Sequence, residues 1–144
     1  MDAPVAPVRS SATEATIAER RLVTVLFADL VSFTDYSEGR DSELVRETLT
    51  RYHEATRHTI EHHGGHVEKF IGDAVMAVWG AHVAHEDDAE RAVRAALELV
   101  DAVAELGEAE GMPGLAARAG VAWAADMFPR RGGSAPVRRC CWTG

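Results

Sequence analysis

Apolar residues in this chain form short runs typical of strands and longer periodic runs typical of helices. Residues 22–28 form an apolar run with β-branched and aromatic side chains and almost no polar interruption, which predicts a central strand covered on both faces. Asp29 ends this run. Residues 32–34 then predict the start of a short helix, whose free backbone N–H groups would point toward whatever the strand end binds.

Two longer segments have a helical period. Asp41 or Ser42 is a candidate N-cap for the first, which Gly64 ends. Its apolar or small positions recur every three or four residues at Val45, Leu49, Tyr52, Ala55, Thr59 and Ile60. The second begins near Asp87, where negative charge suits a helix N-terminus, and ends at Gly111. The side chains predicted to form its buried apolar face are Ala89, Ala92, Val93, Ala96, Leu99, Val100, Val103 and Leu106.

A predicted hairpin lies between the two helices. Residues 66–70 and 74–79 read as strands, joined by a tight turn at Ile71, Gly72 and Asp73. Residues 115–121 predict the start of another strand. The order strand, helix, hairpin, helix, strand predicts an α+β domain whose helices pack on one face of the sheet.

Two carboxylates stand at predicted strand ends, Asp29 after the first strand and Asp73 at the hairpin turn. If the strands are neighbours, the two acids form a divalent-metal site, which suits phosphoryl chemistry on a nucleoside triphosphate. Taken singly, Asp29 could cap the following helix and Asp73 could be a turn former. The pair together favours the metal site.

Composition narrows the class of partner. At 144 residues with 47% hydrophobic and 26% charged residues, the chain is expected to form one globular domain. Its formal net charge of -8 argues against binding to nucleic acid or an anionic membrane, because proteins bind these partners through clustered Lys and Arg. Without an apolar run of about 20 residues or a signal-peptide pattern, a cytoplasmic location is expected.

The two ends of the sequence differ from the middle. Residues 1–19 have no sustained apolar period and predict a disordered leader. Residues 122–144 form an unmatched basic tail with one acid, Asp126, against four arginines: Arg130, Arg131, Arg138 and Arg139. The adjacent Cys140 and Cys141 in this tail cannot join distant parts of a fold.

The chain is rich in histidine between residues 53 and 66. No Cys lies nearby and no His-Glu-x-x-His pattern occurs, so we interpret these side chains as a solvated polar face rather than a zinc site. They are His53, His58, His62, His63 and His66.

Four ordered segments together resemble the class III adenylate/guanylate cyclase catalytic domain, over about residues 20–121. They are Phe-Ala-Asp-Leu-Val-Ser-Phe-Thr at residues 27–34, Gly-Gly at residues 64–65, Lys-Phe-Ile-Gly-Asp-Ala-Val-Met-Ala-Val-Trp-Gly at residues 69–80, and His-Glu-Asp-Asp-Ala at residues 85–89. The resemblance implies a ferredoxin-like cyclase fold that is incomplete at the C-terminus.

The resemblance also implies an activity. Asp29 and Asp73 would be the catalytic aspartates that bind two Mg²⁺ or Mn²⁺ ions, and Leu30 would add a backbone carbonyl as metal ligand. The implied reaction is the conversion of ATP to 3′,5′-cyclic AMP and pyrophosphate in intracellular signal transduction. The family acts as a head-to-tail dimer, so a homodimer or pairing with another cyclase subunit is expected.

Four further residues are expected to bind substrate by resemblance. The loop at residues 31–34, with Phe33 and Thr34, would receive the triphosphate, and Gly72 lies beside it. Lys69 would contact the purine and favour ATP over GTP. Three alternatives stay open: Phe33 as core packing, Thr34 as a first-turn helix residue without a phosphate contact, and Lys69 as a solvated strand lysine.

The chain departs from the family pattern after Val121. Where such domains continue with His-Thr-Gly and later an Asn and an Arg, residues 122–125 read Ala-Trp-Ala-Ala. The chain is therefore expected to be inactive alone, and the alternative function is a non-catalytic nucleotide-binding or dimerisation module that pairs with a complete cyclase subunit. We interpret the abrupt change as a shifted reading frame, a hypothesis that the coding sequence would test.

Overall fold

The computed structural model describes residues 18–129. Residues 1–17 of the predicted leader and residues 130–144 of the predicted basic tail, with Cys140 and Cys141, lie outside the described residues. No helix in the described part is long and apolar enough to cross a bilayer.

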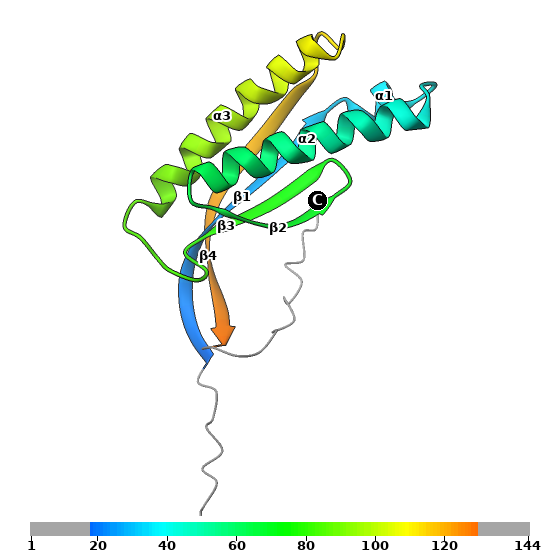
Figure 1. Ribbon diagram of the computed structural model, residues 1–144. Coiled ribbons are helices and arrows are strands. Elements are labelled where there is room, and N and C mark those ends of the chain that lie inside the picture. Colours follow the sequence, from blue (N-terminus) through cyan, green and yellow to red (C-terminus); the bar gives the residue numbers. More distant parts are fainter. Residues whose placement is uncertain (1–17, 130–144) are drawn as a thin grey trace, which may run out of the picture.

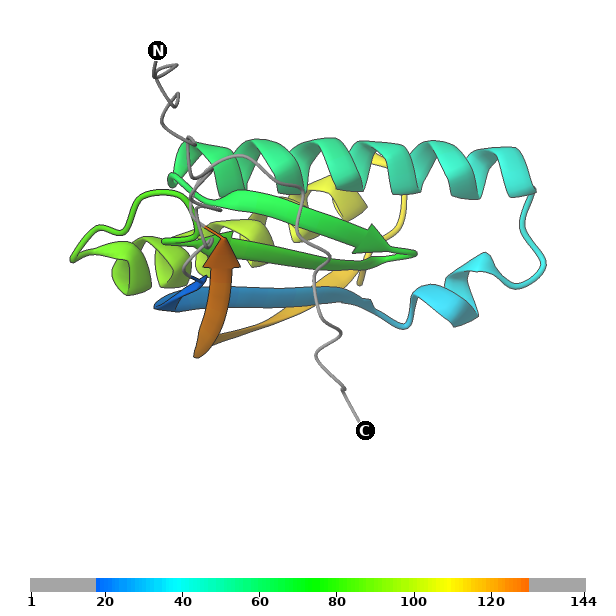
Figure 2. The same cartoon turned by 90° about the horizontal axis from the view of Figure 1, so that it is seen from below.

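The order of elements agrees with the sequence prediction. In chain order they are β1 (Ala18–Val31), α1 (Phe33–Ser37), α2 (Ser42–His62), β2 (His66–Ile71), β3 (Ala74–Trp79), α3 (Asp88–Ala109) and β4 (Ala116–Pro129). Figure 2 shows α1 following the end of β1 and the long α2 running back over the sheet.

The four strands form one sheet in the order β2-β3-β1-β4, and all neighbours are antiparallel. Helices α2 and α3 lie together over one face of this sheet (Figure 1). This is the ferredoxin-like arrangement of a β-α-β-β-α-β unit, with β1 as an inner strand. The predicted fold class is confirmed.

Strand β1 sorts its side chains by alternation. One set packs with the helices in the main core: Leu26, Ala28 and Leu30. The other set lies on the opposite face, called the open face below: Val23, Val25, Phe27 and Asp29. Val23 and Val25 are buried there against Val78, whereas Phe27 is 46% exposed. The prediction of a strand covered on both faces therefore fails at Phe27.

Strand β4 continues past the point where the sequence predicted a change. Val121 pairs with Leu26, and the ladder runs on without a shift to the pair Ala18 and Pro129. The extension of β1 and β4 beyond the hairpin is visible at the bottom of Figure 1. The predicted limits of the domain, residues 20 and 121, thus both fall inside strands, because the first residues of β1 offer a backbone edge with which residues 122–129 pair.

Helix α2 begins and ends where its local chemistry predicts. The carboxylate of the N-cap Asp41 accepts a hydrogen bond from the backbone N–H of Glu43 at 2.8 Å. At the other end Gly64 has φ +78°, a conformation that favours glycine. The indole N–H of Trp79 donates to the carbonyl of His63 at 2.9 Å, which holds this helix end against β3.

Gly65 generates the first prediction. A Cβ at this position would overlap the indole of Trp79 and lie 2.9 Å from Cγ2 of Ile60. Gly65→Ala is therefore expected to lower the free energy of unfolding by about 1–3 kcal/mol through overpacking, measured by urea denaturation. Gly120→Ala is the matched control, since a Cβ there meets nothing within 4 Å. An equal loss of stability in both variants would contradict the packing explanation.

Candidate active site

The structure brings the two predicted aspartates to the same end of the sheet. Oδ2 of Asp73 accepts a hydrogen bond from the backbone N–H of Leu30 at 3.3 Å, and Leu30 directly follows Asp29. The cause is the antiparallel pairing of β1 with β3, which sets Ala28 opposite Val75. The turn that precedes Val75 therefore meets the residues that follow Ala28.

Asp29 has a partner that the sequence did not reveal. Arg118 lies directly opposite it on β4, and its guanidinium donates from Nε to Oδ1 at 2.7 Å and from Nη2 to Oδ2 at 3.0 Å. This bidentate hydrogen bonding, followed by the charge of Asp29, raises the pKa of Arg118 above its ordinary value. The available signal was that Arg118 is the basic residue of the predicted strand at residues 115–121.

The backbone after Asp29 turns sharply. Ser32 has φ 59°, and it is the one residue other than glycine with a positive φ in the described range 18–129. A serine in this left-handed region carries backbone strain of about 1 kcal/mol. Its carbonyl accepts from the N–H of Tyr36 at 3.1 Å, so the strained residue also begins α1.

The two predicted substrate residues of α1 differ in exposure. Phe33 is half-buried, packs against the main core, and stacks on Tyr36 with ring centroids 5.9 Å apart. This placement favours the core-packing alternative for Phe33. Thr34 is exposed, and its carbonyl accepts from Oγ of Ser37 at 2.8 Å.

Gly72 lies in the hairpin turn with φ +61°. Its carbonyl is 2.8 Å from Nε2 of His53 on α2, and the imidazole of His53 lies against Phe70 with ring centroids 4.1 Å apart. The interpretation of His53 as part of a solvated face is therefore wrong, because α2 crosses the hairpin closely enough for the imidazole to contact it. His53 ties the turn that carries Asp73 to the helix.

The other histidines form no shared site. His63 is only 17% exposed and its Nε2 lies 2.6 Å from Oε2 of Glu98, which lowers the pKa of Glu98. His58 and His62 stack along the outside of α2. Within residues 18–129, no group of three or more His, Cys, Asp or Glu side chains is arranged to hold a metal ion.

Lys69 lies on β2, four residues before Asp73 and on the same face of the sheet as Asp29. It is exposed and pairs with Met76, which in turn pairs with Phe27. Directly paired residues share a face, and Phe27 shares its face with Asp29. Lys69 and Asp29 therefore both belong to the open face.

The donor set at this end of the sheet fits a hard divalent cation. Asp29, Asp73 and the backbone of Leu30 offer oxygen atoms only, which suits Mg²⁺ or Mn²⁺ better than zinc. The guanidinium of Arg118 shows that Asp29 can hold a positive charge with both oxygens. The side chain of Asp29 is 34% exposed, so a cation from solution can reach it.

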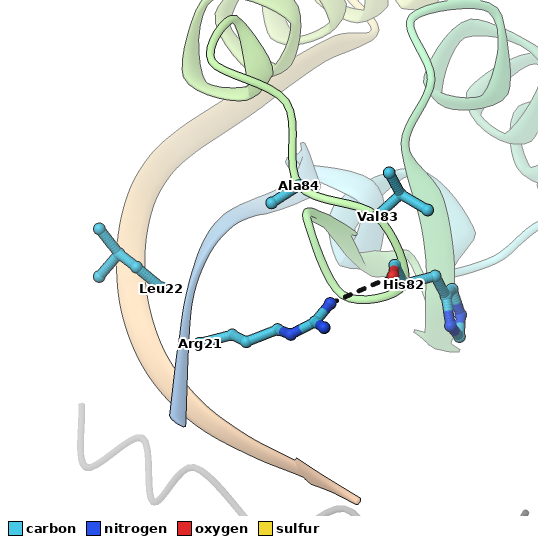
Figure 3. Close-up of a pocket in the computed structure, with 5 residues that line it drawn as sticks. All are labelled: Arg21, Leu22, His82, Val83 and Ala84. Carbon is cyan, nitrogen blue, oxygen red and sulfur yellow. Dashed lines mark hydrogen bonds between the residues drawn. The ribbon is translucent and has the colours of Figure 1, made fainter. Parts of the chain in front are cut away.

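A surface pocket lies elsewhere, at the opposite end of β1. It is lined by Arg21, Leu22, His82, Val83 and Ala84 (Figure 3). The guanidinium of Arg21 donates to the carbonyl of His82 at 3.1 Å across it. None of the predicted site residues lines this pocket.

Comparison with known proteins identifies the class. The sequence pattern of the adenylate and guanylate cyclase catalytic domain matches residues 16–125. The chain belongs to this family, and the match runs a few residues beyond the predicted limit at residue 121.

Among relatives, Adenylate cyclase 1 of Rhizobium meliloti (strain 1021) is 37% identical over 107 residues, which cover 72% of this chain and 16% of that protein. The solved guanylyl cyclase Cya2 is 32% identical with a TM-score of 0.72, over 81% of this chain and 60% of that one. The adenylyl cyclase CyaB from P. aeruginosa is 26% identical with a TM-score of 0.73, over 81% and 62%. This chain therefore spans less than two thirds of each relative.

Tyr52 generates a prediction on pH. Its side chain is fully buried, and burial raises its pKa to about 12, with the charges of Asp73 and Asp29 adding to the effect. Since the unfolded chain ionises its tyrosines near pH 10, the free energy of unfolding should be unaffected by this group below pH 10. It should then fall by about 1.4 kcal/mol per pH unit as the pH rises toward 12.

Tyr52→Phe should remove the loss of unfolding free energy that ionisation of Tyr52 causes at alkaline pH. The measurement is the free energy of unfolding of wild type and variant by urea denaturation between pH 9 and 11.5. Tyr36→Phe, in the half-buried tyrosine of α1, is the control and should keep the fall. If the free energies of unfolding of wild type and Tyr52→Phe differ by the same amount at every pH in this range, the fold does not keep the Tyr52 phenol neutral, and the prediction is wrong.

Proposed function

We propose that this chain supplies the metal-binding half of an adenylate cyclase site, which converts ATP to 3′,5′-cyclic AMP and pyrophosphate. The observation that carries the proposal is the hydrogen bond from the N–H of Leu30 to Asp73. It joins the end of β1 to the hairpin turn, so that Asp29 and Asp73 converge. Two carboxylates on separate elements then serve one cation site.

The chain's own residues position the substrate and balance its charge. Asp29, Asp73 and the carbonyl of Leu30 would hold two Mg²⁺ or Mn²⁺ ions, and the backbone of residues 31–34 would orient the triphosphate. Bound divalent cations supply neutralisation of phosphate charge and a lowered pKa for the ribose 3′-hydroxyl. The protein contributes orientation and screening, and the reaction needs no covalent nucleophile.

The choice of ATP rests on Lys69. It is exposed on the open face that it shares with Asp29, so it can reach a purine bound above that face. The similarity to Adenylate cyclase 1 supports the same choice, whereas the similarity to the guanylyl cyclase Cya2 points toward GTP, so the proposed choice depends on Lys69. We place the site inside the cell, where ATP and Mg²⁺ are available.

The other half of the site comes from a second cyclase subunit in this proposal. Asp29 and Lys69 lie on a sheet face that α2 and α3 leave uncovered, and Phe27 on that face is 46% exposed. A partner that packs on this face would exclude water from the nucleotide and bury apolar area.

A second candidate is a non-catalytic module that binds Mg-nucleotide or pairs with a complete cyclase. The sequence Ala-Trp-Ala-Ala at residues 122–125 favours it, because by family resemblance a His-Thr-Gly segment would stand there. The strand continues through these residues, and Trp123 is 75% exposed. This candidate predicts nucleotide binding without cyclic AMP.

Complementation separates the two candidates. The full chain is mixed with the catalytic domain of CyaB in which the aspartates aligned with Asp29 and Asp73 are replaced by Asn, so that only this chain has an intact metal half. With Mn²⁺ and ATP, cyclic AMP is expected from the mixture and from neither component alone. Nucleotide binding without product in the mixture would favour the non-catalytic module, and product from the chain alone would contradict the half-site.

The aspartates are tested in the same mixture. Asp29→Ala or Asp73→Ala in this chain should lower cyclic AMP formation by about two orders of magnitude or more, because each change removes a cation ligand worth several kcal/mol. Circular dichroism should show a retained fold, since neither side chain belongs to the core. Asp35→Ala, an exposed acid on α1, is the control and should keep activity. Activity that survives either of the first two changes would count against the assignment.

Lys69 is tested by substrate preference. Lys69→Glu should lower the ratio of kcat/KM for ATP to that for GTP about tenfold, because a purine contact contributes roughly 1–3 kcal/mol to discrimination. Arg94→Glu makes the same charge reversal on the outer side of α3 and should leave the ratio unchanged. An unchanged ratio in Lys69→Glu would mean that the purine is read elsewhere.

A further inference from the structure

The ion pair between Arg118 and Asp29 occupies both oxygens of one proposed metal ligand. The two residues face each other across the β1–β4 ladder, so their backbones hold the contact in register. A bidentate guanidinium uses the two carboxylate oxygens that a cation from solution would use. The contact and the cation site therefore overlap at Asp29.

The guanidinium is held loosely enough to leave. The side chain of Arg118 is 76% exposed and that of Asp29 is 34% exposed. Exposed ion pairs contribute little net stability, because water solvates both charges when they separate. Displacement of Arg118 from Asp29 therefore requires a small but non-zero free energy.

A divalent cation and the guanidinium compete for the Asp29 carboxylate. A Mg²⁺ ligand oxygen lies about 2.1 Å from the ion, while the Nε and Nη2 atoms of Arg118 are 2.7 and 3.0 Å from the same oxygens. Both positive charges would then lie a few ångströms apart and repel each other. Binding of one therefore weakens binding of the other.

We propose that Arg118 is a placeholder cation at Asp29, which competes with the divalent cation and thereby sets the cation affinity of the site. The inference rests on the metal site in the proposed function. Without a divalent cation, Arg118 neutralises and orients the Asp29 carboxylate. With the cation, the guanidinium swings into solvent while its backbone stays in the β4 ladder.

The experiment measures Mn²⁺ binding to the full chain without nucleotide, by calorimetry and by the electron paramagnetic resonance signal of free Mn²⁺. Arg118→Gln should bind Mn²⁺ about two- to tenfold more tightly than wild type, because the competitor is gone. Arg118→Lys keeps the positive charge but loses the bidentate hydrogen bonding, so its Mn²⁺ affinity should lie between those of wild type and Arg118→Gln. Arg94→Gln removes another exposed arginine, 2.6 Å from Glu90, and should bind as wild type does.

A second readout follows Arg118 itself. In ¹⁵N spectra the side-chain Nε–H signal of Arg118, identified by its loss in Arg118→Gln, should shift on addition of Mg²⁺ with the midpoint of cation binding. A purely structural cross-strand pair would change the unfolding midpoint on substitution, without a change in cation affinity or in this signal. That result would overturn the inference.

Asp29→Asn separates this inference from the proposed function. If Mn²⁺ binding needs Asp29 but Arg118→Gln binds no more tightly than wild type, the placeholder role is overturned and the metal site stands. If Asp29→Asn binds as wild type does, or no variant binds Mn²⁺, both the site and the placeholder role are overturned. Tighter binding in Arg118→Gln that Asp29→Asn abolishes supports both.

Discussion

The antiparallel pairing of β1 with two neighbours is the constraint on which the rest of the structure depends. Its pairing with β3 carries the hairpin turn to the end of β1, where Asp73 accepts from the N–H of Leu30. Its pairing with β4 sets Arg118 opposite Asp29. One inner strand thus determines which charges meet, because a sheet ladder allows no independent adjustment of residues that lie opposite each other.

The two faces of the sheet have different roles: one packs against the helices, and the other carries the proposed site residues Asp29 and Lys69. The face under α2 and α3 carries the main core, including Trp79 and Tyr52. The open face carries the charged groups Asp29 and Lys69 beside exposed Phe27. A substitution on the open face can therefore change charge without opening the core.

The proposed cation site is built on rigid elements, and in the proposal its occupant exchanges. Asp29 is fixed by the strand and the turn of Asp73 is tied to α2 through His53 and Gly72. In contrast, Arg118 reaches Asp29 with a long, exposed side chain. In the proposal, Arg118 neutralises one of the two carboxylate charges when no metal is bound, which reduces the repulsion between Asp29 and Asp73.

The sequence by itself determined the order of the elements, the α+β class, the family, and the place of Asp73 in the hairpin turn. It put Asp29 just after the first strand, whereas β1 continues two residues further, to Val31. These follow from local periodicity, from turn residues such as Gly72, and from ordered motifs, all of which are read within short segments. Only the tertiary structure decided that Arg118 meets Asp29, that His53 contacts the hairpin, and that β4 continues past Val121. Asp29 and Arg118 are 89 positions apart in sequence, and such contacts depend on strand register, which no local pattern specifies.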